Sequence, residues 1–301
     1  MRAYLQAMRL ERWPRSLAIF IGSASFFFLN RSLVTGSVWD YGFHLAAAFI
    51  LTWGISTANY VINEIVDAPY DAHHPTKKSR PLVQGLISKK SFAALGVLLT
   101  ALSLCAAWLF YSPSFFFALL SLLIAGFIYN IHPVRTKDIP FLDSISESAN
   151  NPIRFLIGWF ALSPASSFPP VFLLLSWWSF GNFLLVAKRL SEFRFLKDKA
   201  GDYRKSLRKY SRRSLLLGMA VSAAVFFLTY VLFSISFKLQ IFLLLTPFLA
   251  VFFLLIYRKT LMEQEIMEEP ERLLQQPRFA IYTLFLVLLF LAAILWDRVG
   301  F

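Results

Sequence analysis

Residues 59–81 read NYVINEIVDAPYDAHHPTKKSRP and form the end of a long apolar segment and the loop that follows it. Within this stretch Asn59, Asn63, Asp67 and Asp71 recur every four residues, so on a helix their side chains lie on one face. Glu64 flanks that face. Acidic and polar side chains this close to hydrocarbon are rare, so the row predicts a functional site rather than a solvated helix end.

The row consists of oxygen ligands only, which is the donor set that a hard cation such as Mg²⁺ prefers. Mg²⁺ usually binds together with the phosphates of a substrate, so we expect a diphosphate substrate. The basic loop that follows, with Lys77, Lys78 and Arg80, supplies positive charge for phosphate oxygens.

The composition indicates a membrane protein. Hydrophobic residues make up 57% of the 301 residues, Phe alone occurs 33 times, and the mean hydropathy is +0.60. Nine apolar segments are of spanning or near-spanning length, and we therefore predict an all-α integral membrane protein with about nine transmembrane helices and one domain over 1–301. They are 17–28, 44–65, 91–111, 114–131, 142–162, 170–187, 215–235, 241–257 and 279–296.

The net charge of 30 − 17 = +13 is concentrated in alternate loops between these segments. Basic residues precede the first segment and follow the second, fourth and sixth, while the intervening loops carry almost none. The positive-inside rule then places the N-terminus in the cytoplasm and the acidic row at the cytoplasmic face. The only cysteine, Cys105, excludes an intrachain disulfide and a cysteine-based zinc site.

The fifth segment carries polar residues at helical spacing, namely Asp143, Glu147, Asn150 or Asn151, and Arg154. We interpret it as one helix that faces the protein interior, kinked at Pro152, with Asn151 and Arg154 near a substrate cavity. A second interpretation is that these residues pair with each other, for example Glu147 with Arg154, or with polar groups across the bundle.

The motif of Asn63, Glu64, Asp67 and Asp71, followed by Arg80 and Pro81, resembles the first signature of the UbiA superfamily of membrane transferases. The usual signature has Asp where this chain has Glu64. The resemblance implies nine helices around a central cavity. It also implies that Asn63, Glu64, Asp67 and Asp71 bind Mg²⁺ and the diphosphate.

The second aspartate-rich signature of that superfamily is missing. At its place stand Lys188, Arg189 and Glu192, with Arg204 and Lys205 further along. A more cationic site favours a substrate with more phosphate. This pattern resembles the decaprenyl-phosphate phosphoribosyltransferase branch, which implies transfer of a 5-phosphoribosyl group from phosphoribosyl diphosphate to a polyprenyl phosphate.

The resemblance implies catalytic roles for Asp67, Asp71, Lys188, Arg189 and Glu192. Glu192 would hydrogen-bond the ribose or orient Lys188 at the i to i+4 spacing. The substrate-binding residues that we expect in addition are Asn59, Asn63, Lys77, Arg80, Tyr129, Arg135, Asn151 and Arg154.

Two alternatives stay open from the sequence. The first is a prenyltransferase that moves a prenyl group from a prenyl diphosphate to an aromatic or lipid acceptor, and the missing second aspartate pair counts against it. The second is a transporter or lipid-binding membrane protein whose charged face lines a translocation path, which inverted repeats would support, but none is visible. The expected partners are lipid and diphosphate substrates and the membrane, with no nucleic acid, and the oligomeric state is left open.

Overall fold

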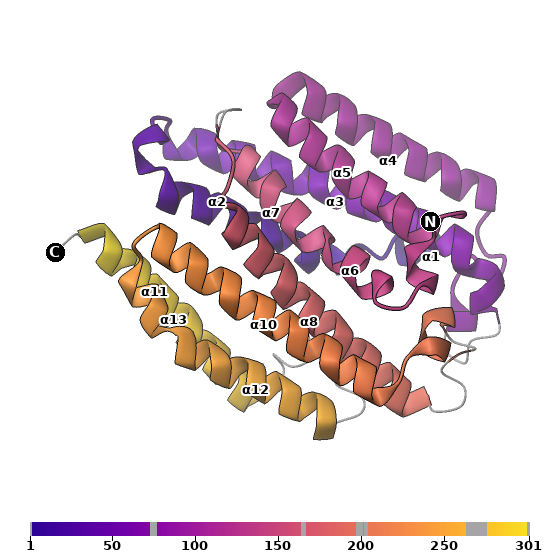
Figure 1. Cartoon of the computed structure of the whole chain (residues 1–301). Helices are drawn as coiled ribbons and strands as arrows, with labels where there is room; N and C mark the ends of the chain where they lie inside the picture. The colour runs from indigo at the N-terminus through magenta and orange to yellow at the C-terminus, as the bar shows by residue number, and fades with distance from the viewer. Residues whose placement is uncertain are drawn as a thin grey trace. The chain divides into compact units, whose positions relative to one another are not determined.

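The computed structural model describes residues 2–72, 77–163, 167–196, 201, 204–262 and 276–299, and this part of the chain contains helices and no strand (Figure 1). The chain divides into two compact units. Unit 1 comprises Met1–Lys137 and Ala149–Pro169, and unit 2 comprises Asp138–Ser148 and Pro170–Phe301. The single domain expected for 1–301 stays a prediction.

Unit 1 is built on the long helix α3 (Val38–Asp71), against which α4 (Lys89–Phe110), α5 (Pro113–Asn130) and α7 (Asn150–Phe160) pack. Serine side chains begin two of these helices, since Ser88 accepts a hydrogen bond from the Ser91 amide and Ser112 one from the Phe115 amide. The remaining elements of unit 1 are α1 (Arg2–Ala7), η1 (Leu10–Leu17), α2 (Ala18–Leu29), η2 (Arg31–Leu33) and η3 (Lys77–Ser79), with η4 (Thr136–Asp138) at its boundary.

Two glycines bring α2 and α7 into close contact. A Cβ atom at Gly22 would lie 2.0 Å from the Phe155 carbonyl oxygen, and one at Gly158 would lie 1.8 Å from the Ile19 carbonyl oxygen. Ser23 adds a hydrogen bond, because its hydroxyl donates to the Gly158 carbonyl at 2.7 Å. Small residues at helix contacts are the usual means of close packing in membranes, where the lipid removes most of the hydrophobic drive.

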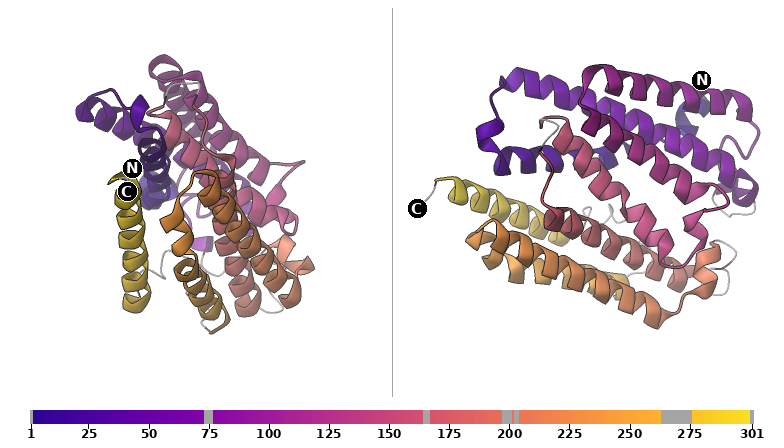
Figure 2. Two further views of the ribbon diagram at one scale, coloured as in Figure 1. Left: turned by 60° about the vertical axis from the view of Figure 1, so that its left-hand side comes forward. Right: turned by 45° about the horizontal axis from the view of Figure 1, so that its top comes forward.

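Unit 2 is built on a pair of long helices, α8 (Val171–Leu196) and α10 (Arg212–Ser236), which run side by side in Figures 1 and 2. Helix α10 begins with a capping box in which Ser211 and Ser214 bond to each other's backbone amides. The other elements of unit 2 are α6 (Leu142–Ser148), η6 (Lys205–Lys209), α11 (Gln240–Leu244), α12 (Thr246–Met262) and α13 (Pro277–Val299).

All nine apolar segments are helical in the described residues, and six of the helices are long and apolar enough to cross a membrane by length and composition. These six are α3, α4, α5, α8, α10 and α13. The other three segments form the shorter α2 and the divided pairs α6/α7 and α11/α12. Nine spans and a cytoplasmic N-terminus stay predictions.

The fifth segment differs from the single kinked helix that we predicted. It divides at Ala149 into α6 and α7. Pro152 explains the division, because it has no N–H to donate to the carbonyl of Ser148. By contrast, α3 continues through Pro69 to Asp71, so it is one helix that carries the whole acidic row.

Candidate active site

Asp67 lies on α3 between two cationic side chains that follow α5. Its Oδ1 atom is 2.5 Å from Lys137 Nζ and 3.3 Å from Arg135 Nη2. Lys137 Nζ also donates to Asn130 Oδ1 at 3.1 Å, and Arg135 Nη1 to the Asn130 carbonyl at 3.2 Å. Both cations are buried, so the low local dielectric strengthens their attraction for the carboxylate.

The backbone after α5 directs Arg135 toward Asp67. Arg135 has a φ of 28°, in the left-handed region that residues other than glycine rarely adopt. Its amide donates to the Ile131 carbonyl at 2.8 Å, which closes the turn. Unusual backbone conformations of this kind gather at functional sites, where the surrounding contacts hold them in place.

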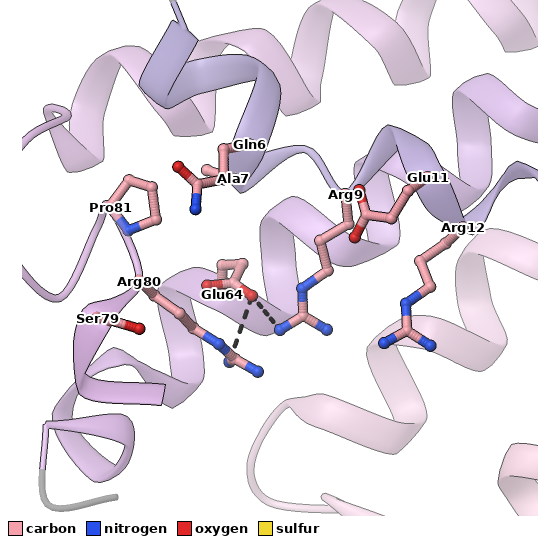
Figure 3. Close-up of a pocket in the computed structure, with 9 residues that line it drawn as sticks. All are labelled: Gln6, Ala7, Arg9, Glu11, Arg12, Glu64, Ser79, Arg80 and Pro81. Carbon is pink, nitrogen blue, oxygen red and sulfur yellow. Dashed lines mark ion pairs between the residues drawn. The ribbon is translucent and has the colours of Figure 1, made fainter. Parts of the chain in front are cut away.

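Glu64 and Asp71 share one cationic partner, Arg80, which follows η3. Arg80 forms an ion pair with Asp71, and its Nη1 atom lies 3.3 Å from Glu64 Oε1. The same Glu64 oxygen forms an ion pair with Arg9, so two guanidinium groups converge on one buried carboxylate (Figure 3). A buried charge requires such partners, because desolvation without them costs several kcal/mol.

Three further predicted site residues, Asn59, Asn63 and Tyr129, lie on α3 and α5. Asn59 donates its amide to the Leu122 carbonyl of α5 at 2.8 Å, and Gly126 of α5 leaves room for it, since a Cβ there would lie 2.1 Å from Asn59 Oδ1. Asn63 and Tyr129 are half-buried. Lys77 lies in η3, but its side chain is outside the described residues, as are His73 and His74.

Arg154 lies on α7 within unit 1 and is 8% exposed. Its Nη2 atom donates to Ser56 Oγ on α3 at 3.2 Å, whereas its buried Nε–H has no hydrogen-bond acceptor within the described residues. Such an unsatisfied buried donor is unusual in a folded protein. Asn151 is half-buried on the first turn of the same helix.

In unit 2, Arg189 is fully buried and bonds to three carboxylates. Its Nε donates to Asp143 Oδ2 at 2.8 Å, its Nη2 to Glu147 Oε2 at 2.6 Å, and its Nη1 to Glu192 Oε2 at 3.0 Å. Arg189 thus joins α6 to α8. Glu147 therefore pairs with a polar group on another helix of the bundle, Arg189 of α8.

Asp143 receives further hydrogen bonds from the connection between α8 and α10. The Tyr210 hydroxyl donates to Oδ1 at 2.5 Å, and the Ser206 hydroxyl donates to Oδ2 at 3.0 Å. Burial and the adjacent carboxylate raise the pKa of the Tyr210 phenol well above its usual value, which keeps the donor protonated. Lys188 is half-buried beside this cluster on α8.

The donors on α3 fit a hard cation chemically, because they are carboxylate and amide oxygens. They are not gathered into a ready site, since no group of three or more His, Cys, Asp and Glu among the described residues is arranged to hold a metal ion. Mg²⁺ commonly binds through one or two carboxylates and completes its shell with waters and substrate phosphates. Asp67 and Asp71 meet that smaller requirement.

Two cationic partners in unit 1 were not among the predicted site residues, namely Arg9 and Lys137. Arg9 is 55 positions from Glu64 along the chain and Lys137 is 70 positions from Asp67. Local spacing carries no information on such pairs. The only indication of Arg9 and Lys137 in the sequence was that basic residues cluster before the first apolar segment and after the fourth.

Sequence and structure comparisons define the class. The model of the UbiA prenyltransferase family matches residues 20–274. The chain therefore belongs to the UbiA prenyltransferase family, and it is an integral membrane protein of the transferase class. This confirms the resemblance seen in the motif on α3.

Two relatives are decaprenyl-phosphate phosphoribosyltransferases. The protein from Mycobacterium tuberculosis is 26% identical over 231 residues, which cover 75% of this chain and 72% of that protein. The protein from Mycolicibacterium smegmatis is 23% identical over 237 residues, which cover 77% of this chain and 70% of that protein.

Among solved structures, a UbiA homolog from Archaeoglobus fulgidus, bound to DMAPP and Mg²⁺, has the same fold. The TM-score is 0.71 at 19% identity, over 97% of this chain and 98% of that one. The similarity extends over almost all of both chains, so the helical architecture of this family applies to this protein.

Proposed function

We propose that this protein is a Mg²⁺-dependent transferase that moves a 5-phosphoribosyl group from phosphoribosyl diphosphate to a polyprenyl phosphate. The observation that carries the proposal is the alternation of charge at the end of α3, where Asp67 contacts Arg135 and Lys137 while Glu64 and Asp71 contact Arg80. Carboxylates suit the cation and the basic groups suit the diphosphate that the cation accompanies. The names of the mycobacterial relatives support this choice of donor and acceptor.

In this proposal Asp67 and Asp71, assisted by Asn63, hold Mg²⁺, which when bound would neutralise charge on the diphosphate. Glu64 has a different role, because it is buried and both of its ion-pair partners are arginines. It holds Arg9 and Arg80 in place.

The chemistry is a displacement at the anomeric carbon of the ribose. A phosphate oxygen of the polyprenyl phosphate forms a bond to that carbon, and the bond from the carbon to the diphosphate oxygen breaks, with the electron pair leaving on the diphosphate. No general base is needed, because the attacking oxygen is already anionic. Arg80, Arg135 and Lys137 stabilise the leaving group and, with positioning of the two substrates, account for the catalysis.

The remaining predicted residues keep their proposed roles on the strength of the family resemblance. Lys77, Tyr129, Asn59 and Asn151 contribute to substrate binding, and Lys188 is a catalytic residue that holds a phosphate. Arg154 offers its Nε–H to a polar substrate group. Arg189 acts as a positioning residue that orients Glu192, since its donors are taken up by carboxylates.

A transfer assay on the purified protein in detergent tests the proposal. Radiolabelled phosphoribosyl diphosphate is offered with polyprenyl phosphate and Mg²⁺, and labelled prenyl diphosphate is offered in parallel with aromatic acceptors. We expect label to move into the lipid in the first arm. Asp67→Asn should lower that rate by about a hundredfold or more, as expected for loss of an electrostatic catalytic group.

The matched control is Asp40→Asn, an exposed carboxylate at the opposite end of the same helix that accepts a hydrogen bond from Ser37. Its rate should equal that of the unaltered protein. Transfer in the second arm alone would identify a prenyltransferase instead, the alternative suggested by the DMAPP-bound structural relative.

A further inference from the structure

The N-terminal segment forms one wall of a polar cavity in unit 1. The cavity measures about 230 Å³, and its lining includes Arg9, Glu11 and Arg12 from the segment, Glu64 from α3 and Arg80 from the loop after η3. Figure 3 shows the Arg9 and Arg12 side chains extending to the same side of the segment. We call this cavity the N-terminal arginine pocket.

The backbone at Arg9 brings these two arginines together. Arg9 has φ 51° and ψ 46°, a left-handed conformation that ends α1 and begins the 3-10 helix η1. The Arg12 amide donates to the Arg9 carbonyl at 2.9 Å in the first turn of η1, and Figure 3 shows both side chains on one side. A left-handed arginine costs of order 1 kcal/mol or more and is retained where the surrounding contacts fix it.

Arg9 is fixed by two contacts with α3. It forms the ion pair with Glu64, and its guanidinium lies 6.0 Å from the centroid of the Tyr60 ring. A guanidinium has five N–H donors, and these contacts engage only part of them. Glu64 thus holds the Arg9 and Arg80 guanidinium groups at the pocket without saturating their donors.

The charge and the size of the pocket identify the kind of ligand group. Three arginines and two glutamates line it, which gives a net charge of 3 − 2 = +1. Its 230 Å³ lies below the roughly 300–1,000 Å³ of pockets that enclose a whole small molecule. Guanidinium groups match the oxygens of a phosphate in a bidentate manner, so the pocket suits a single phosphate group and not a lipid tail.

We propose that the N-terminal arginine pocket binds the terminal monophosphate of a substrate, with Arg9 and Arg12 as ligands. This inference rests on the proposed function, in which the diphosphate is held near Asp67 and one further phosphate on each substrate needs a partner. The monophosphate has two sources, the 5-phosphate of the soluble donor and the headgroup of the lipid acceptor. The arms of the experiment distinguish them.

The experiment is a titration of the full-length protein in detergent micelles by calorimetry. Three probes are used: ribose 5-phosphate, a short-chain polyprenyl monophosphate, and pyrophosphate with Mg²⁺. Arg12→Gln should weaken one of the two monophosphates by about tenfold, since a charge-assisted contact is lost, and should leave pyrophosphate within about twofold. The monophosphate that is weakened identifies the source.

Glu11→Gln is the matched control on the same wall. It removes a negative charge beside the arginines, so the affinity for the same monophosphate should rise by about twofold or more. Arg9→Gln should have the effect of Arg12→Gln. Where Arg9→Gln fails to fold because Glu64 loses a partner, Arg12→Gln and Glu11→Gln carry the test.

The proposal is overturned if neither monophosphate changes in Arg12→Gln, or if pyrophosphate weakens to the same degree. These binding measurements do not depend on turnover. Failure of the transfer assay with intact monophosphate binding would therefore refute the proposed reaction and leave the pocket established.

Discussion

Two arrangements of charge occur in this protein, and they differ at the level of single residues. On α3 the carboxylates of Glu64, Asp67 and Asp71 contact cations from other elements, and Asp67 is 21% exposed. In unit 2 the relation is reversed, because one arginine with no exposed surface binds three carboxylates. The first arrangement leaves a carboxylate that a ligand can reach, whereas in the second a buried arginine holds three carboxylates in place.

Arg189→Met should therefore destabilise the protein strongly. Removal of the guanidinium leaves Asp143, Glu147 and Glu192 near one another without their shared partner, and breaking a buried ion pair in this way costs about 3–5 kcal/mol. Thermal unfolding in detergent, followed by tryptophan fluorescence, measures the loss.

Lys205→Gln is the control for that prediction. Lys205 is 55% exposed and lies 3.8 Å from Asp138, and exposed pairs contribute about 0–1 kcal/mol. Equal melting temperatures for the two variants would show that the Arg189 cluster contributes no more than a surface pair.

The site residues on α3 could be predicted from the sequence, because polar side chains that recur every four residues lie on one face of a helix, and such residues are rare beside an apolar segment. Two of their cationic partners, Arg80 and Arg135, were predicted as well, whereas Arg9 and Lys137 were not. Lys137, Arg9 and Tyr210 reach their carboxylates from positions distant along the chain, and only folding determines those pairs. Arg189 shows the limit of reasoning from charge alone, since a basic residue expected to hold phosphate has its donors engaged by Asp143, Glu147 and Glu192.

At the scale of elements, the contact of α2 with α7 depends on the absence of side chains. Gly158→Ala places a methyl group where the Ile19 carbonyl oxygen lies, at 1.8 Å, so the two helices must separate. We expect a loss of about 1–3 kcal/mol, as for other overpacked contacts. The yield and melting temperature of the purified variant measure it.

Gly42→Ala is the same substitution at a place on α3 where, apart from the adjacent backbone of the helix itself, nothing lies within 4 Å of the added Cβ. It should leave the melting temperature unchanged or raise it slightly, because alanine favours a helix by about 1 kcal/mol over glycine. A Gly158 variant as stable as this one would contradict the tight packing of α2 on α7.

The fifth segment shows why element boundaries are harder to predict than elements. Its polar residues at helical spacing suggested one helical face from Asp143 to Arg154. The missing N–H of Pro152 instead ends α6 before α7 begins, so Asp143 and Glu147 belong to unit 2 while Asn151 and Arg154 belong to unit 1. Pro152 is evident in the sequence. A proline within a helical segment can either kink the helix or divide it, and the sequence alone does not distinguish these two outcomes.

At the scale of the whole molecule, the apolar segments gave the helical class and the positions of all nine segments, since hydrocarbon requires long uninterrupted apolar runs. The apolar segments did not predict the exact residues at which the helices begin and end. Helix α3 begins at Val38, six residues before the predicted start, and runs to Asp71 beyond the apolar part. Polar residues at a membrane surface extend a helix without changing the hydropathy signal.

Orientation in the membrane is the prediction that belongs to this scale. Lys78 and Thr35 are exposed at opposite ends of α3, and Cys105 is the only cysteine. In a Cys105→Ser background, Lys78→Cys should react with a membrane-impermeant maleimide only from the cytoplasmic side, and Thr35→Cys only from the outside. The basic loop after α3 is the reason, by the positive-inside rule. Reversed labelling would place the acidic end of α3 outside the cell.

The ion pairs of α3 have a consequence for how the protein matures. Because Glu64, Asp67 and Asp71 are already paired with Arg9, Arg80, Arg135 and Lys137, we expect unit 1 to fold without a divalent ion. A newly inserted chain would then reach its final form before it meets either substrate. Treatment with a chelator should stop transfer yet leave the melting temperature within about 1 °C, as expected when no folded-state ligand is lost. Added Mg²⁺ should then restore the full rate at once, and such a protein can be stored without metal and activated at the moment of use.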